Sequence, residues 1–324
     1  MFQVNYLSYG GILLPLMFSY AFAQTNIFPE KTIHLVVPFA AGSATDQLAR
    51  ALAVEINAET KTPLVVDNKP GANGNLAAQY VAQAQADGYT IFITTNTTQA
   101  ANAHLLKSLN YDPVKDFAPI SGLNNGGAQV MLISGSSGVN NLSDFIAAAK
   151  SASAPLNYGH GSSTARVAAE MLQQMAGIKL QQIPYKSNVF AITDLLGKQI
   201  EMTITDLATG IPQIKSGKLK ALAVSSLTRS SLLPEVPTMD ESGLKGYELA
   251  FWSAAYAPVK TNPEVINRLN ALISKASLGP AMQNYYAMTG SQRFITKPDE
   301  LVSFQEVETQ KWGKVIRAAG IEKE

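Results

Sequence analysis

The stretch Ile33-His34-Leu35-Val36-Val37-Pro38-Phe39-Ala40-Ala41-Gly42-Ser43-Ala44-Thr45-Asp46 carries the strongest structural signal in this chain. Its apolar, β-branched start predicts a buried strand, and a loop of small residues follows. A helix is expected to open at Asp46, because Leu48, Leu52 and Ile56 recur at helical spacing. The start of a helix presents backbone N–H groups without partners at the positive end of its dipole. The stretch is therefore a candidate anion-binding corner, although ordinary βα turns show the same pattern.

The composition describes a globular chain with almost no net charge. The chain has 324 residues, of which 46% are hydrophobic, and a formal net charge of +1. This length suffices for two domains. Without a basic stripe, the chain is not expected to bind nucleic acid or an anionic membrane surface. Cysteine is absent, which excludes disulfides, thiolate metal sites and a cysteine nucleophile, and fits an oxidising compartment.

The beginning of the chain has the pattern of an export signal. Residues 10–23 are almost wholly apolar, and Ala21-Phe22-Ala23 is an A-x-A cleavage pattern before Gln24. The apolar segment is too short for a comfortable membrane span. No Lys or Arg precedes it, so only the terminal amine supplies positive charge. We expect residues 1–23 to be a signal peptide that is cleaved after Ala23.

Short apolar runs alternate with helical patterns through most of the remaining chain. This alternation favours a mainly parallel sheet with helices on its faces. A second corner of the first kind occurs where a strand at 156–158 runs into Gly159-His160-Gly161-Ser162-Ser163-Thr164 and a helix near 166–176. We expect two α/β domains, with crossings near 121–127 and 225–230 and a ligand cleft between them. Domain I would comprise residues 24–124 and 228–324, and domain II residues 125–227.

Several longer motifs occur in order between residues 29 and 321. They include Val66-Asp67-Asn68-Lys69-Pro70-Gly71, Tyr111-Asp112-Pro113-Val114-Lys115-Asp116-Phe117-Ala118-Pro119, Pro184-Tyr185-Lys186, Thr193-Asp194-Leu195-Leu196-Gly197 and Gly217-Lys218-Leu219-Lys220-Ala221-Leu222-Ala223-Val224. Through them the chain resembles the Bug-type, TctC-like periplasmic solute-binding receptors of tripartite tricarboxylate transport systems. The resemblance implies a two-domain periplasmic-binding-protein type II fold, or Venus flytrap, with a cleft between its lobes.

The resemblance also implies a function. A receptor of this family would close in the periplasm on a small carboxylated molecule: a mono- or dicarboxylate, an amino acid or an aromatic acid. It would then deliver the ligand to the membrane subunits of a tripartite tricarboxylate-type transporter. We expect a monomer that needs no cofactor or metal.

The first corner supplies half of the candidate ligand contacts. Small side chains let an anionic oxygen approach the backbone closely, and hydroxyls add hydrogen-bond donors. Asp46 has two interpretations, a helix cap or, in an amino-acid receptor, the partner of an amine. The candidates in this corner are Phe39, which could cover the ligand, and Ala41, Gly42, Ser43, Ala44, Thr45 and Asp46.

The second corner and two strand ends supply the remaining candidates. In the second corner these are Gly161, Ser162 and Ser163. Thr95 and Thr97 follow a strand end, and strand ends of open α/β sheets face ligand crevices. The remaining candidate in this group is Asp206, at a place where the family has Asp or Asn. It would cap the next helix or meet an amine or hydroxyl of the ligand.

The chain departs from the family pattern at two places. The loop 159–164 is shorter than usual, and Arg166 stands near the position of a common histidine. Arg166 would contact a second carboxylate of the ligand or lie in solvent in the first helical turn. Ser187-Asn188-Val189-Phe190 replaces a Gly-rich stretch, and Phe190 would line the cleft or pack. We expect loop length, Arg166, Asp206 and Phe190 to set which acid is bound.

Two alternative functions stay open at this point. A hydrolase would need His160 beside a loop serine with an acid behind it, but the chain has no H-E-x-x-H, G-x-S-x-G or P-loop motif. A receptor could also signal to a membrane sensor kinase. We expect a binding protein and no enzyme, and we expect valine at Gly42 or Gly161 to block binding while the fold survives.

Overall fold

The structure, a computed structural model, describes residues 1–5 and 28–324. The predicted cleavage pattern at Ala21-Phe22-Ala23 therefore lies outside the described residues, and so does most of the predicted signal peptide. Within the described ranges, every helix is too short or too polar to cross a membrane.

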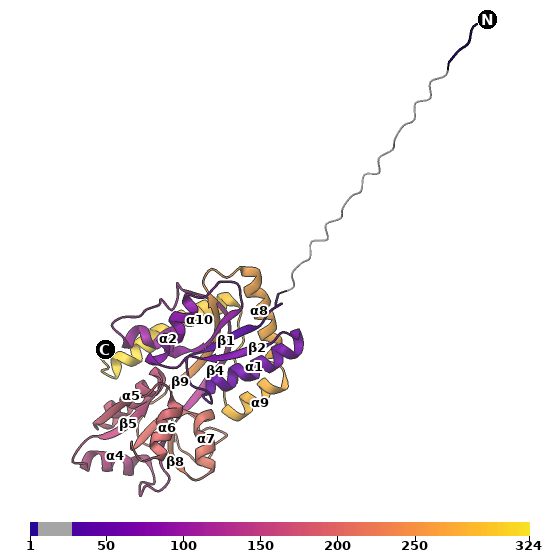
Figure 1. The fold of residues 1–324 in the computed structure, drawn as a ribbon. Helices are drawn as coiled ribbons and strands as arrows, with labels where there is room; N and C mark the ends of the chain where they lie inside the picture. The colour runs from indigo at the N-terminus through magenta and orange to yellow at the C-terminus, as the bar shows by residue number, and fades with distance from the viewer. Residues whose placement is uncertain (6–27) are drawn as a thin grey trace.

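Ten strands in the described part of the chain form one connected sheet. Figure 1 shows the arrangement of the elements, with the N-terminal residues in indigo and the C-terminal residues in yellow. Its main path runs in the order β2-β1-β3-β9-β4-β7-β5-β6, and β8 and β10 both pair with β4. The strands are β1 (Ile33–Val37), β2 (Leu64–Asn68), β3 (Thr90–Thr95), β4 (Phe117–Ser134), β5 (Leu156–His160), β6 (Leu180–Pro184), β7 (Met202–Asp206), β8 (Leu219–Val224), β9 (Ala250–Pro258) and β10 (Gln292–Arg293).

The long strand β4 divides this sheet into two lobes. Its residues 117–128 pair with β9, and its residues 129–134 pair with β7 and β8. We call lobe I the part built on β1, β2, β3, β9, β10 and the first part of β4, and lobe II the part built on the second part of β4 with β5, β6, β7 and β8. The chain returns from β8 to lobe I through residues 225–249. The exact domain limits, at residues 125 and 228, stay a prediction.

The expected mainly parallel sheet is correct for the outer strands and wrong for the middle. β1 pairs in parallel with β2 and β3, and β5 does so with β6 and β7. The strands β4, β8, β9 and β10 pair antiparallel to their neighbours. The crossing predicted near residues 121–127 lies within β4, where Asn124 and Gly127 pair with β9 and Asn125 pairs with β10.

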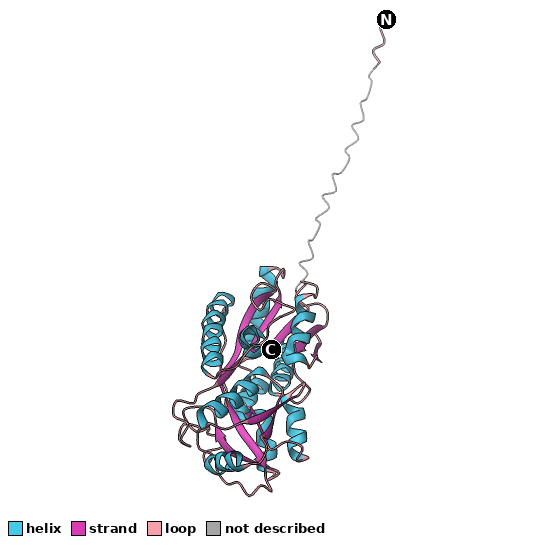
Figure 2. Ribbon diagram, turned by 90° about the vertical axis from the view of Figure 1, so that its left-hand side faces the viewer, coloured by secondary structure: helices cyan, strands magenta, loops and turns pink. Residues whose placement is uncertain are grey.

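Helices flank the strands of both lobes (Figure 2). Those of lobe I are α1 (Ala44–Thr60), α2 (Asn75–Ala82), α3 (Asn102–Leu105), α8 (Pro263–Ala276), α9 (Pro280–Thr289) and α10 (Pro298–Ala318), with a 3₁₀ turn at Ala72–Gly74 and a π-helical turn, η2, at Thr97–Ala101. Those of lobe II are α4 (Leu142–Ser151), α5 (Ser163–Ala176), α6 (Asn188–Leu196) and α7 (Leu207–Lys215).

Apolar side chains on both faces of β1 anchor the first corner. Ile33, Leu35 and Val37 are fully buried in one cluster with residues of α1 and α8, while Val36 lies in a second cluster on the opposite face. Successive side chains of a strand point to opposite faces, so a strand covered on both sides reads as a continuous apolar run. Each buried aliphatic side chain contributes about 1.5–3 kcal/mol. The loop between β1 and α1 is thus held by a rigid strand and a rigid helix.

Candidate functional site

Ser43 starts helix α1. It is the N-cap, and its Oγ accepts a hydrogen bond from the Asp46 N–H at 3.3 Å. The helix therefore begins at Ala44, and the expectation that it opens at Asp46 is corrected by two residues. Serine is one of the preferred N-cap residues. Asp46 lies in the first turn instead, where its negative charge interacts favourably with the positive end of the helix dipole.

The Asp46 carboxylate is committed to local partners. Its oxygens accept hydrogen bonds from the Gly42 N–H at 2.9 Å, from Asn68 Nδ2 at 3.0 Å and from Arg50 Nε at 3.0 Å. Burial by itself raises the pKa of this carboxyl, but the bonds from Arg50, Gly42 and Asn68 bring the pKa below its ordinary value. Asp46 is thus an ionised group that fixes the loop around Gly42.

Ser162 starts helix α5 in the same way. It is the N-cap, and its Oγ accepts from the Ala165 N–H at 3.2 Å. In both caps the serine oxygen is used as an acceptor, so the hydroxyl hydrogen is left to donate elsewhere. The first N–H groups of each helix, at Ala44, Thr45, Ser163 and Thr164, also have no acceptor within the helix.

These two helix starts, one in each lobe, border the same cavity. The cavity encloses about 400 Å³ of space, part of it open to solvent. Among the described residues, its wall contains no Lys, Arg or His. It consists of Phe39, Ser43, Ala44, Thr45, Thr95, Thr97, Gln129, Ser162, Thr164, Ser187, Asn188, Asp206 and Phe251. Eight of the candidate contacts are therefore brought together, namely Phe39, Ser43, Ala44, Thr45, Thr95, Thr97, Ser162 and Asp206.

Five other candidates lie near the cavity but do not form its wall. Ala41 and Gly42 are exposed, and the Asp46 carboxylate is held by its neighbours. The Gly161 N–H donates to Asn188 Oδ1 at 2.7 Å, and Ser163 Oγ donates to Asn102 Oδ1 at 2.6 Å. That any of these five touches a ligand stays a prediction.

Arg166 lies neither in solvent nor on the cavity wall. Its side chain is only 6% exposed, and Nη1 donates to Glu324 Oε1 at 2.7 Å. The expectation that Arg166 lies in solvent is therefore wrong, because its guanidinium is buried and paired with Glu324. A contact between Arg166 and a ligand stays a prediction.

Asp206 caps a helix and also borders the cavity, as its two predicted roles require. It is the N-cap of α7, and Oδ1 accepts from the Thr209 N–H at 2.8 Å and from Thr209 Oγ1 at 2.6 Å. It also borders the cavity. Burial raises the pKa of this carboxyl. The cavity wall thus carries one acidic side chain among described residues that are otherwise neutral.

Sequence reasoning missed five residues of the wall, namely Gln129, Thr164, Ser187, Asn188 and Phe251. Ser187 and Asn188 follow strand β6 and begin α6, so the strand–loop–helix rule applied at the two corners would have found them. Gln129 and Phe251 lie on the crossing strands β4 and β9, whose register the sequence does not reveal. Phe190, by contrast, is exposed and does not belong to the wall.

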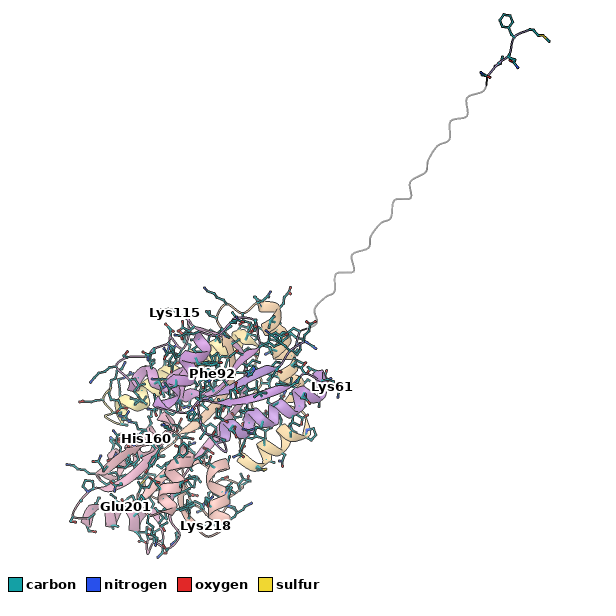
Figure 3. The ribbon with its side chains drawn as sticks, in the orientation of Figure 1. Lys61, Phe92, Lys115, His160, Glu201 and Lys218 are labelled. Atoms are coloured by element: carbon teal, nitrogen blue, oxygen red, sulfur yellow. The ribbon has the colours of Figure 1, made fainter. Side chains whose placement is uncertain are left out.

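His160 does not form the nucleophile–base pair that a hydrolase needs. Its side chain is buried, and neither ring nitrogen has a partner in the part of the chain that the structure describes. Burial, together with the charge of Arg166, lowers the pKa of His160 to about 4. Figure 3 shows His160 at the end of lobe II that faces lobe I. A neutral imidazole without a hydroxyl partner gives the hydrolase alternative no support.

Two α/β lobes joined by a crossing strand, with a polar cavity between opposed helix starts, define a periplasmic-binding-protein fold. The family described as "Tripartite tricarboxylate transporter family receptor", TctC, matches residues 48–321. The chain belongs to this family, whose members are periplasmic solute-binding receptors rather than enzymes.

Related proteins match this chain over nearly its whole length. BugT of Bordetella pertussis is 31% identical over 301 residues, which cover 92% of each chain. The structure of Rpa4515 of R. palustris with adipate is 31% identical, with a TM-score of 0.87, over 92% of this chain and 100% of that one. The structure of MatC from Rhodopseudomonas palustris with bound malate is 28% identical, with a TM-score of 0.83, over 89% of this chain and 100% of that one.

Proposed function

We propose that this protein captures a small carboxylate between its lobes in the periplasm and delivers it to a tripartite tricarboxylate-type membrane transporter. The observation that carries the proposal is the pair of serine N-caps, Ser43 in lobe I and Ser162 in lobe II, on the wall of one cavity. The exported protein would lack residues 1–23 and act as a monomer.

The electrostatics of the cavity favour a carboxylate over a polyanion. Each helix start acts as roughly half a positive charge, and each hydrogen bond to an ionised group contributes about 1.5–3 kcal/mol. No Lys or Arg among the described wall residues is present to neutralise several charges. Adipate and malate, bound by two relatives of known structure, are dicarboxylates, which supports acids of this size.

Binding would require the lobes to open and close. The cavity lies between helix starts that belong to different lobes, so a ligand that contacts both stabilises the arrangement in which they approach. Such closure would bury the ligand and present one joined surface to the transporter.

A thermal-shift screen of the mature protein tests the proposal. The probes are succinate, adipate, malate, aspartate and benzoate, each compared with the compound in which amides replace its carboxylates. An acid at 100 times its Kd should stabilise the protein by about 2.7 kcal/mol and raise its melting temperature, while the amide should not. Isothermal titration then gives the Kd. The proposal fails if no acid raises the melting temperature, or if the amides raise it equally.

A further inference from the structure

We infer that Asn188 is a specificity-determining residue whose side-chain Nδ2 donates a hydrogen bond to a carboxylate oxygen of the ligand. The inference rests on the proposed function and names the donor at one end of the cavity. Asn188 is the first residue of α6 and lies on the cavity wall.

The contact between Asn188 and Gly161 fixes the orientation of the side-chain amide. Asn188 Oδ1 accepts from the Gly161 N–H at 2.7 Å. The reversed amide would place its NH₂ group against this N–H, so that two donors would face each other. The Nδ2 atom therefore points away from Gly161, and no described residue accepts a hydrogen bond from it.

This arrangement replaces one anion donor with another. The Gly161 N–H belongs to the second corner and would be free to bind a ligand if Asn188 were a small residue. The two loops are in close contact, since a Cβ at Gly161 would overlap the backbone of Ser187 and Asn188. Asn188 Oδ1 accepts the hydrogen bond of the Gly161 N–H, so this N–H is no longer available to a ligand. The Nδ2 group of Asn188, on the cavity wall, is the donor in its place.

The neighbouring Ser187 provides independent evidence that the part of the cavity at the start of α6 binds a ligand. It is 1% exposed, its Oγ has no partner within the described residues, and it also lies on the wall. Unlike Ser43 and Ser162, it does not cap its helix through its side chain. A buried polar group without a partner is costly, and a ligand oxygen would remove that cost. The first residues of α6 thus supply two adjacent donors.

The variant Asn188→Asp tests this assignment. It keeps an oxygen that accepts from the Gly161 N–H, and it replaces the donor by a carboxylate oxygen. We expect a lower melting temperature without ligand, because the variant places a carboxylate on a buried part of the cavity wall. The affinity for succinate or adipate should fall at least about 10-fold, because one hydrogen bond to a charged group is lost and the new carboxylate repels those of the ligand. The corresponding monoamide can donate to the new carboxylate, so the preference for the diacid over the monoamide should fall at least as much.

Two further variants complete the experiment. Asn284→Asp, at an exposed position of α9 outside the cavity wall, makes the same charge change in solvent and should leave both affinities unchanged. Ser187→Ala removes the unpaired hydroxyl, and it should weaken acid binding without lowering the melting temperature of the ligand-free protein. This variant also tests the α6 subsite if Asn188→Asp folds poorly.

The outcomes separate this inference from the proposed function. If the wild type binds a diacid and both cavity variants bind diacid and monoamide as the wild type does, the role of Asn188 is overturned and the proposed function stands. If the wild type binds none of the acids, both are overturned.

Discussion

At the scale of single residues, Asp206 is the one acidic side chain among the described residues of the cavity wall. Its carboxylate caps α7 and borders the cavity, and burial raises its pKa. The folded protein therefore binds a proton at Asp206 more tightly than the unfolded chain does. The stability from this group is fully present below the unfolded pKa, near 3.9, and is lost as the pH rises through the higher folded pKa.

The variant Asp206→Asn should raise the melting temperature of the ligand-free protein at pH 7. Asparagine caps a helix as well as aspartate does, so the variant removes the unfavourable charge and keeps the cap. The gain should shrink as the pH falls towards 4, where the wild-type carboxyl becomes protonated. Thermal denaturation at several pH values measures this, and a gain that grows at low pH would contradict it.

The same variant distinguishes two kinds of ligand. A ligand that carries only carboxylates is repelled by ionised Asp206, so Asp206→Asn should tighten its binding. A ligand with an ammonium group loses a partner and should bind more weakly. Malate and aspartate differ in the hydroxyl or ammonium group at one carbon, so titration of both with wild type and variant gives the answer. Equal effects on the two would show that Asp206 does not face the ligand.

Gly42 and Gly161 differ in the room for a side chain, which corrects the expectation for valine. A Cβ at Gly42 meets no atom within 4 Å, but its φ of +84° disfavours other residues, so alanine there should cost about 1 kcal/mol. A Cβ at Gly161 overlaps backbone of the neighbouring loop. The expectation that valine at Gly161 spares the fold is therefore wrong. Denaturant unfolding should show Gly161→Ala several times more destabilised than Gly42→Ala.

At the scale of elements, the first turn of α5 is fastened to lobe I. Ser163 Oγ donates to Asn102 at 2.6 Å, Asn96 Nδ2 donates to Thr164 Oγ1 at 2.8 Å, and Arg166 pairs with Glu324. Glu324 is itself held against α3 by a backbone bond from its N–H to Leu105. The anion-binding end of α5 is thus positioned by the opposite lobe.

Removing the charge of Glu324 should destabilise this contact. Glu324→Gln leaves the buried guanidinium of Arg166 without an opposite charge. Because Glu324 is half exposed, we expect a loss of about 1–2 kcal/mol rather than the larger cost of a fully buried pair. The melting temperature should fall by about 2–4 °C per kcal/mol. The exposed Glu322→Gln is the control, and an equal effect of both variants would contradict the prediction.

The elements that sequence predicts well are those with periodic apolar residues. The buried run of β1, the serine-rich corners and helices such as α1 and α5 are recognisable because packing and capping act locally. The crossing strands β4 and β9 are not, since their pairing depends on segments more than a hundred residues apart. For the same reason Gln129 and Phe251 escaped prediction, and the burial of Arg166 depends on a partner 158 residues away.

At the scale of the whole molecule, the two lobes meet across threonines as well as across the cavity. Thr97 Oγ1 of η2 lies 3.4 Å from Thr164 Oγ1 of α5. The chain contains no cysteine, so within one molecule each introduced thiol has only the other one to pair with. The variant with Thr97→Cys and Thr164→Cys therefore places one thiol on each lobe.

Oxidation of this double variant should lock the lobes together. A disulfide formed with ligand present should trap it, and one formed without ligand should prevent access, while reduction should restore exchange. The measured quantity is the dissociation rate of labelled ligand, with each single variant as a control. Wild-type exchange in the oxidised protein would show that the lobes need not separate.

The unpaired amides at the two helix starts have a consequence for isotope exchange. The N–H groups of Ala44, Thr45, Ser163 and Thr164 have no acceptor in their own helices, so in the empty protein they should take up deuterium faster than amides one turn further along. A guest that accepts hydrogen bonds from them would slow this uptake in two peptides far apart in the chain at once. Mass spectrometry of those two peptides would therefore report occupancy of the cleft even for a guest whose chemical identity is unknown.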